Sequence, residues 1–502
     1  MRLSECSANK LKRISRKKRI ICFGAGANLF YLFEVYKNLK LEEKVSFIID
    51  NDKSKAGTFA QLNGCKIEIK QAEALKEIDI SKYVIVITAL KYQEIFSQVQ
   101  NICGNPYGIC YKAPNKRFGL AKHVVRIMCR LPLGDVIVLN GEGDTCENAE
   151  ALGKYIAENH YFNKYRLVWL CEHPERFQGS SREIYLNRRT PMTALSLWAV
   201  VKYYFYVGRA KYIIYENQIV HKLRMEQVSV YLNHGSPPIK ATKGVITLPP
   251  NLNYAISPSA FSTAIISEQY SVNRERILEC GSPRTDILFS EGSKEREQQW
   301  KEKMKADTYH KIILWVPTFR QRKNTNRVDT AKDFLFGIPS IHSGGDLAQL
   351  MDALRKYNIL IIYKPHFLQD LNHLKVNSAE NFIIMTQNDL ESWQATIYDI
   401  MKIADAMVTD YSTIGFDFML LDRPIGYTID DMKDYKLGFS VPNAMELMPG
   451  MKIENIDGLK DFIGSVANGR DEFAEERGRV SRLVHDYPDG NNCRRLCERL
   501  RL

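Results

Sequence analysis

Short apolar runs alternate with longer amphipathic stretches along the chain, which predicts an α/β protein. Continuous apolar runs bounded by polar turns are typical of parallel strands that are buried on both faces. The expected strands are Ile20–Phe23, Val45–Ile49, Asp135–Asn140, Arg166–Cys171, Lys211–Tyr215, Val228–Leu232, Ile312–Val316, Ile359–Tyr363, Phe382–Met385, Ala406–Thr409 and Ile425–Tyr427. After Ala406–Thr409, a polar turn and a helix starting near Ile414 lead into the last strand, which is a βαβ step.

The strand series starts afresh at two points, which divides the chain into three α/β parts. We expect a basic N-terminal segment, a small Rossmann-like unit, a basic amphipathic connector, two further α/β lobes and a basic C-terminal helix. Their expected bounds are 1–18, 19–112, 113–134, 135–305, 306–480 and 481–502.

The small unit opens with the turn Gly24-Ala25-Gly26 after its first strand, and Asp50 ends its second strand. This resembles the start of a dinucleotide-binding fold, in which the acidic residue holds a ribose. Leu29 stands where the third glycine of that fingerprint belongs. The sequence therefore leaves open a bound nucleotide and a structural or docking role.

Polar residues follow several of the predicted strands, at the ends where open α/β sheets bind ligands. His234 follows Val228–Leu232, while Arg320, His366 and Asp410–Thr413 follow three strands of the last lobe. Ser412 or Thr413 is predicted to cap the next helix, whose free N–H groups suit a phosphate. The alternative is an ordinary capped helix.

The net charge of +12 over 502 residues favours an acidic partner, such as nucleic acid, anionic lipid or a phosphorylated substrate. No helix-turn-helix, RNA-recognition or zinc-finger pattern supports nucleic acid. Basic residues lie beside apolar ones in Lys116–Arg130 and Arg494–Leu502, which predicts helices lying on an anionic membrane. Solvated basic faces of core-packed helices are the alternative.

The cysteine pattern and the apolar stretches indicate a cytoplasmic protein that is peripheral to the membrane. Eleven scattered cysteines without paired metal-ligand spacing suit a reducing compartment. The first 19 residues lack the apolar segment of a signal peptide. The aromatic stretch Thr190–Gly208 contains Lys202 and predicts a membrane-facing or core helix rather than a span.

Five motifs in order carry a resemblance to a known family. They are NHGSPPIK (233–240), GSPRTD (281–286), VPTFR (316–320), KPH (364–366) and TDYSTIGFDFMLLDRPIGY (409–427). Together they resemble the CDP-glycerol glycerophosphotransferase family, the teichoic acid polymerases and primases, over about residues 135 to 480. The chain departs from the family pattern at Asn233, which replaces a tryptophan, at the longer Pro237-Pro238-Ile239, and at Phe367.

The resemblance implies a GT-B fold, with the acceptor bound by 135–305 and a CDP-linked donor by 306–480. It implies transfer of glycerol phosphate or ribitol phosphate to a hydroxyl of a lipid-linked or glycan polymer acceptor, with release of CMP. The product would be a teichoic-acid-like or capsular polymer, made on the cytoplasmic face of the membrane.

The same resemblance suggests roles for individual residues. His234 is expected to act as the base and His366 to assist the leaving CMP, with Ser412 and Thr413 holding the phosphates. Further candidates for substrate binding are Arg284, Arg320, Asp410 and Asp417. No Asp-x-Asp pair follows a strand at the expected cleft, so we expect neither an essential metal nor a cofactor.

Two other functions remain open on the sequence. One is a GT-B glycosyltransferase that uses a nucleotide sugar. The other is a nucleotide-sensing or docking protein with an inactive transferase module.

Overall fold

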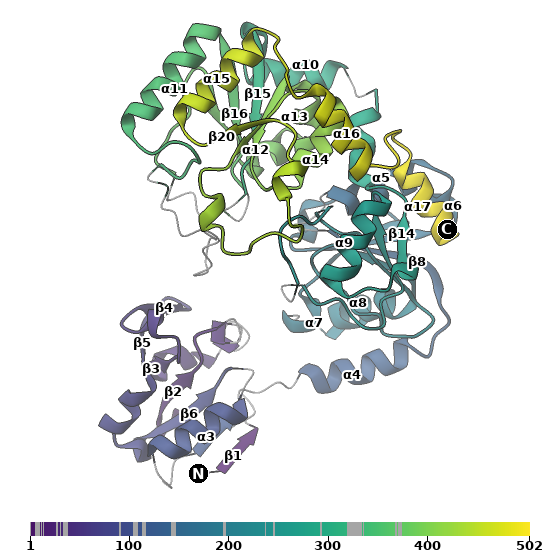
Figure 1. The fold of residues 1–502 in the computed structure, drawn as a ribbon. Helices are drawn as coiled ribbons and strands as arrows, with labels where there is room; N and C mark the ends of the chain where they lie inside the picture. Colours follow the sequence, from purple (N-terminus) through teal and green to yellow (C-terminus); the bar gives the residue numbers. More distant parts are fainter. Residues whose placement is uncertain are drawn as a thin grey trace. The chain divides into compact units, whose positions relative to one another are not determined.

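A computed structural model gives the fold (Figure 1) and divides the chain into two compact units. One unit comprises Met1–Leu131 with Arg188–Phe205, and the other Pro132–Asn187 with Tyr206–Leu502. The structure describes residues 2–5, 11, 13, 15–26, 29–30, 32–33, 39–89, 92–103, 109–112, 117–141, 147–193, 197–235, 237–243, 246–291, 294–318, 334, 336–366, 369 and 374–502.

The N-terminal unit contains a seven-stranded sheet in the order β1-β7-β6-β2-β3-β5-β4. All neighbouring strands are parallel except β4 and β5. The elements are β1 (Arg2–Glu5), β2 (Arg19–Phe23), β3 (Val45–Ile49), β4 (Phe59–Leu62), β5 (Cys65–Lys70), β6 (Tyr83–Ile87), α3 (Tyr92–Cys103) and β7 (Ile109–Lys112). The predicted Rossmann-like unit is therefore confirmed.

The carboxylate of Asp50, which the sequence suggested as a ligand for a ribose, is bonded to other groups of the protein. Its Oδ2 accepts a hydrogen bond from the backbone N–H of Ala25 at 2.6 Å and lies 3.2 Å from Lys55 Nζ. Its Oδ1 accepts from the N–H of Asp52 at 2.9 Å. Since both oxygens hold the glycine turn and the strand end together, the structure favours the structural role over a bound nucleotide.

The first lobe of the second unit has a sheet in the order β10-β9-β8-β11-β12-β13-β14, with all strands parallel. The strands are β8 (Gly134–Asn140), β9 (Arg166–Cys171), β10 (Glu183–Asn187), β11 (Ala210–Tyr215), β12 (Val228–Tyr231), β13 (Tyr254–Ser257) and β14 (Ile277–Glu279). Its longer helices are α5 (Glu147–Glu158) and α9 (Ala260–Tyr270), and the short α6 (Tyr161–Lys164) follows α5.

The second lobe has a parallel sheet in the order β17-β16-β15-β18-β19-β20. Its strands are β15 (Lys311–Trp315), β16 (Ile359–Tyr363), β17 (Phe382–Ile384), β18 (Ala406–Thr409), β19 (Ile425–Thr428) and β20 (Met451–Ile453). Its helices are α10 (Lys294–Lys303), α11 (Gly344–Tyr357), α12 (Gln387–Ser392), α13 (Ile397–Ile403), α14 (Ile414–Phe418), α15 (Ile456–Ala467) and α16 (Ala474–Val484).

Both lobes share the strand order of doubly wound nucleotide-binding folds. In each sheet the chain reverses direction beside its first strand, between β8 and β11 in one lobe and between β15 and β18 in the other. Ligands bind at such reversal points, outside the carboxyl ends of the strands. The predicted pair of Rossmann-like GT-B lobes is confirmed, and its strand order indicates where the site lies.

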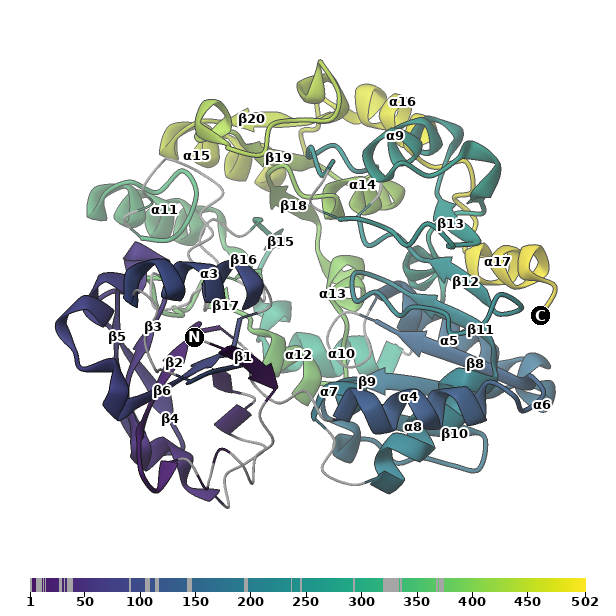
Figure 2. The ribbon, with the colours of Figure 1, turned by 90° about the horizontal axis from the view of Figure 1, so that it is seen from below.

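The C-terminal helix α17 (Asn492–Leu500) packs on the first lobe rather than on a membrane (Figures 1 and 2). Cys493, Leu496, Cys497 and Leu500 are buried in the core formed with β8, β9 and β11. The Tyr212 hydroxyl donates to the Leu500 carbonyl oxygen at 2.9 Å. The predicted interfacial role for this tail is therefore wrong, because its apolar face fills the core and only its basic face is solvated.

The two other stretches considered for a membrane also form helices. The connector contains α4 (Arg117–Met128), and Thr190–Gly208 forms α7 (Thr190–Thr193) and most of α8 (Leu197–Arg209). No helix among the described residues is both long and apolar enough to cross a membrane.

Candidate active site

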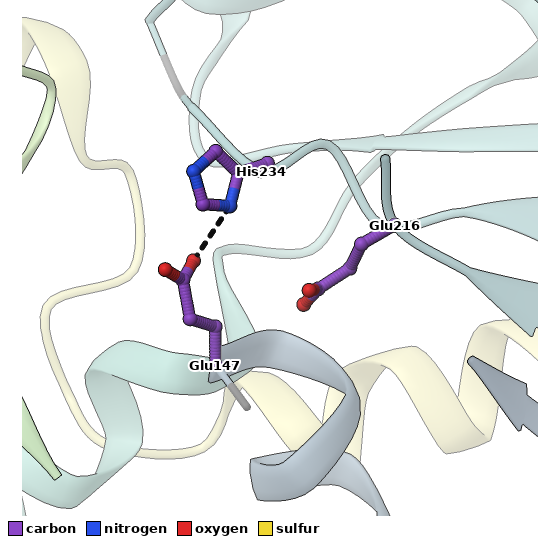
Figure 3. A group of neighbouring side chains, drawn as sticks. All are labelled: Glu147, Glu216 and His234. Atoms are coloured by element: carbon purple, nitrogen blue, oxygen red, sulfur yellow. Dashed lines mark ion pairs between the residues drawn. The ribbon is translucent and has the colours of Figure 1, made fainter. Parts of the chain in front are cut away.

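His234 lies just beyond the carboxyl end of β12, and a carboxylate fixes its ring (Figure 3). Its Nδ1 is 2.9 Å from Glu147 Oε2, at the start of α5. Asn233 and Glu147 both have a left-handed backbone, with φ of 42° and 56°. Asparagine adopts that region more readily than most residues, which gives the departure at Asn233 a local reason. Left-handed backbone at non-glycine residues is costly and clusters at functional sites.

Arg284 holds the Glu147–His234 pair from behind. Its Nη1 lies 3.0 Å from Glu147 Oε2 and donates to the carbonyl oxygen of His234. The charge and hydrogen bonds of these two partners outweigh burial, which alone would raise the pKa of Glu147, and lower that pKa well below its usual range. Glu147 is therefore ionised at neutral pH.

Arg284 also joins the two lobes. Its Nη2 is 2.9 Å from Oδ2 of Asp417 in α14, which also accepts a hydrogen bond from the Tyr398 hydroxyl at 2.7 Å. Arg284 is 4% exposed and Asp417 0%. Both side chains are therefore held in a buried contact between the lobes, and their predicted roles in substrate binding stay predictions.

Glu216 follows β11 and brings a second carboxylate near His234 (Figure 3). It is fully buried, and its Oε1 accepts a hydrogen bond from the N–H of Ala149 at 3.0 Å. Ligand atoms of Glu147, Glu216 and His234 lie within 4.8 Å of one another, a group that could hold a metal ion. The expectation of no metal stays a prediction.

His366 follows β16 of the second lobe and lies near the His234 group. The pKa of His366 is held well below its usual value, first by burial and then by the nearby side chains of Lys240, His234 and Lys364. Its ring is therefore neutral at pH 7 in the free protein. Because Lys240 and Lys364 both act on this imidazole, they bring positive charge suited to an anion to the carboxyl edges of the two sheets.

The loop after His234 is bonded to the second lobe. Lys240 pairs with Phe439 in an isolated antiparallel bridge, Ala241 N–H donates to the Gly438 carbonyl oxygen, and Ser440 N–H donates to that of Ile239. A Cβ atom on Gly235 would lie only 3.1 Å from Thr413 Oγ1. The two lobes are thus bonded to each other directly beside His234.

The Asp410–Thr413 turn follows β18, and α14 begins at Ile414 as predicted. Thr413 occupies the N-cap position without a side-chain capping bond, so the predicted cap is absent. Asp410 is 1% exposed, and its Oδ2 accepts hydrogen bonds from the N–H and hydroxyl of Thr318, both at 2.9 Å. Asp410 therefore joins two strand ends, while Ser412 and Thr413 remain partly exposed.

The structure brings His234, His366, Arg284, Asp417 and Thr413 together. Arg320 lies outside the described residues. The sequence analysis missed Glu147, which follows β8 in a polar turn that contains other carboxylates.

Comparison with known proteins adds to the geometry. Residues 125–502 match the family model described as CDP-glycerol:poly(glycerophosphate) glycerophosphotransferase. A teichoic acid glycerol-phosphate transferase of Staphylococcus aureus is 28% identical over 250 residues, 49% of this chain and 59% of that protein. A teichoic acid poly(glycerol phosphate) polymerase of Staphylococcus epidermidis is 27% identical over 348 residues, 64% of this chain and 44% of that protein.

A solved structure of the wall teichoic acid polymerase TagF has the same fold, with a TM-score of 0.60 at 19% identity, covering 82% of this chain and 97% of that one. The chain spans about half the length of the two curated relatives that it matches. The family model matches well over half of the chain and includes every motif quoted above. The chain therefore belongs to the CDP-glycerol:poly(glycerophosphate) glycerophosphotransferase family.

Proposed function

We propose that this protein is a phosphotransferase that moves a polyol phosphate from a CDP-polyol to a hydroxyl of a lipid-linked or polymer acceptor and releases CMP. One observation carries the proposal: a carboxylate-paired histidine and a neutral histidine lie close together at the carboxyl edges of two Rossmann-like sheets. An alcohol is a weak nucleophile at neutral pH, and imidazole is a suitable base for it.

In the proposed reaction the acceptor oxygen attacks the phosphorus that bears the polyol. The proton of the acceptor hydroxyl passes to His234 as the new O–P bond forms. The bond that breaks joins the attacked phosphorus to the oxygen that bridges the two phosphorus atoms of the donor. CMP leaves with the electron pair of this bond. His366 donates a hydrogen bond or a proton to the departing oxygen.

The donor's diphosphate would lie on the second lobe. Lys240 and Lys364 add positive charge beside His366, and Ser412 and Thr413 offer hydroxyl donors at the adjacent strand end. Fixed positive potential of this kind stabilises the charge that builds up on phosphate oxygens during transfer. Arg320 remains a proposed donor ligand on the motif alone.

A panel of donors tests the substrate class. The two curated relatives are named for glycerol phosphate, which supports CDP-glycerol as the first donor to test. CDP-ribitol is the second donor of the panel. We expect CMP release and thermal stabilisation with one or both, and neither with UDP-sugars. Stabilisation by a UDP-sugar alone would favour the nucleotide-sugar glycosyltransferase.

We also propose that the protein acts at an anionic membrane surface on the cytoplasmic side, through α4 and the start of α8. These helices expose large apolar side chains, with Ile127 at 56%, Leu197 at 53% and Trp198 at 75% exposure. Arg126, Arg130 and Lys202 are exposed on the same two stretches. Apolar and aromatic residues beside basic ones are typical of interfacial helices.

A further inference from the structure

We infer that Glu147 is the positioning residue for His234: it fixes the ring through Nδ1 and directs Nε2 to the acceptor hydroxyl. This inference rests on the proposed function, in which His234 is the base. Nothing in the family match or the motifs points to Glu147, and the inference depends on where the fold places it.

The contact is built from two separate strand ends. Glu147 comes from the turn after β8 and His234 from the turn after β12, and their Oε2 and Nδ1 atoms are 2.9 Å apart. Asn148, next to Glu147, donates from its side-chain amide to the Leu232 carbonyl oxygen at 3.1 Å. The two turns are thus bonded to each other beside the ion pair, which holds the carboxylate and the ring in register.

Arg284 keeps the carboxylate in place. It binds Glu147 Oε2 and the backbone of His234 on one side and Asp417 on the other, and it is 4% exposed. Glu147 therefore has a fixed cationic partner and cannot rotate away without leaving a buried guanidinium underpaired. The orientation of His234 is consequently linked to α14, the helix of the second lobe that carries Asp417.

Proton transfer from the acceptor hydroxyl requires that the proton of the neutral His234 ring stays on Nδ1. A neutral imidazole carries its proton on one nitrogen and a lone pair on the other. With the proton on Nδ1, which lies 2.9 Å from Glu147 Oε2, the lone pair is on Nε2, where it can accept the proton of the acceptor hydroxyl. The ionised Glu147 then faces the imidazolium that this transfer produces.

The kinetic test compares two equivalent substitutions. Glu147→Gln removes the charge at the site, and Glu175→Gln does the same at the exposed pair His173–Glu175, where Nδ1 and Oε1 are 3.1 Å apart. We expect Glu147→Gln to lower kcat for CMP release by roughly 10- to 100-fold, less than removal of a general base, which costs about 10²–10⁴. The Kd for CDP should stay within about twofold, and Glu175→Gln should match the wild-type protein. Wild-type kcat in Glu147→Gln would overturn the inference.

A spectroscopic test is independent of turnover. Two-bond ¹H–¹⁵N correlation spectra report which ring nitrogen carries the proton, and loss of one signal in His234→Gln identifies His234. We expect the Nδ1–H form in the wild-type protein and a shift toward the Nε2–H form in Glu147→Ala, or in Glu147→Gln where the alanine variant does not fold. An unchanged tautomer would overturn the inference even if the enzyme is active.

These two measurements distinguish a failure of the proposed function from a failure of the positioning role of Glu147. If no CDP-polyol gives turnover while the tautomer depends on Glu147, the proposed function fails and the positioning role stands. The group of Glu147, Glu216 and His234 allows a different role, as metal ligands. Loss of wild-type turnover in EDTA, its recovery with Mn²⁺ or Mg²⁺, and weaker metal binding in Glu147→Gln would overturn the positioning role.

Discussion

At the scale of single residues, the ion pair of Arg284 and Asp417 is a buried link between two lobes. Removing one partner of such a pair leaves an uncompensated buried charge, which typically costs about 3–5 kcal/mol. We predict that Asp417→Asn lowers the free energy of unfolding by about that amount in urea titrations. Asp457→Asn is the control, because Asp457 is exposed and pairs with Lys460 at the surface, where a loss of about 1 kcal/mol or less is expected. Equal losses of unfolding free energy in the two variants would contradict a stabilising role of the buried Arg284–Asp417 ion pair.

The buried position of His366 leads to a prediction about proton uptake when CDP binds. Burial and nearby cations hold its pKa well below 6.5 in the free protein, so the ring is neutral at pH 7. A bound diphosphate adds negative charge, which favours the protonated ring and raises that pKa. Binding of CDP should therefore take up a proton, and affinity should increase as pH falls from about 7.5 to 6.

Calorimetry in buffers of different ionisation enthalpy measures this proton uptake directly. His366→Gln should abolish it, whereas His173→Gln, at an exposed histidine, should leave it unchanged. Binding without proton uptake in the wild-type protein would mean that His366 stays neutral and acts only as a hydrogen-bond donor.

At the scale of elements, the sequence predicted where strands end. It did not predict which side chains from different strand ends lie in contact. The expected strands Ile359–Tyr363 and Ala406–Thr409 have the observed bounds, because buried parallel strands are continuous apolar runs between polar turns. That pattern correctly placed His234 and His366 at strand ends. Glu147 was missed because its turn also contains Glu142 and Asp144, and nothing local distinguishes the carboxylate that meets His234.

Long-range pairing explains the other differences. Arg284 and Asp417 are far apart in sequence, so their motifs gave no sign that the fold pairs them with each other. The tail was similarly ambiguous, since an apolar stripe beside basic residues fits a membrane and a protein core equally well. Only tertiary contacts show that α17 completes the first lobe.

The packing of α17 makes a prediction about stability. Leu496 is fully buried in the core of the first lobe, and Leu→Ala substitutions in cores cost about 2–5 kcal/mol. We expect Leu496→Ala to lower the urea midpoint accordingly. Arg494→Ala removes an exposed residue of the same helix and should cost about 1 kcal/mol or less. A tail that acts at a membrane instead would give no loss of stability in Leu496→Ala and reduced vesicle binding.

At the scale of the whole molecule, the exposed residues of α4 and α8 make a prediction about membranes. Burial of a large apolar side chain contributes about 1.5–3 kcal/mol, so replacing Trp198 and Leu197 together by serine should weaken binding to phosphatidylglycerol vesicles at least about tenfold. Met225→Ser is a suitable control, because Met225 is equally exposed at 75% but lies in the other unit.

Co-sedimentation with vesicles of phosphatidylglycerol and of phosphatidylcholine measures both the apolar and the electrostatic contribution. Binding should be stronger to the anionic vesicles and should fall with added salt. Equal binding of the Trp198/Leu197 variant and the wild-type protein would show that this surface is not the membrane contact.

The central claim is that His234 is the base of a CDP-polyol phosphotransferase, and one measurement tests it most directly. Single-turnover release of CMP from CDP-glycerol or CDP-ribitol, with an acceptor present, should be lost by about 10²–10⁴-fold in His234→Ala. The rate should be unchanged in His173→Ala, and both variants should unfold at the wild-type urea concentration. CMP release by folded His234→Ala within a few-fold of the wild-type rate would contradict the account.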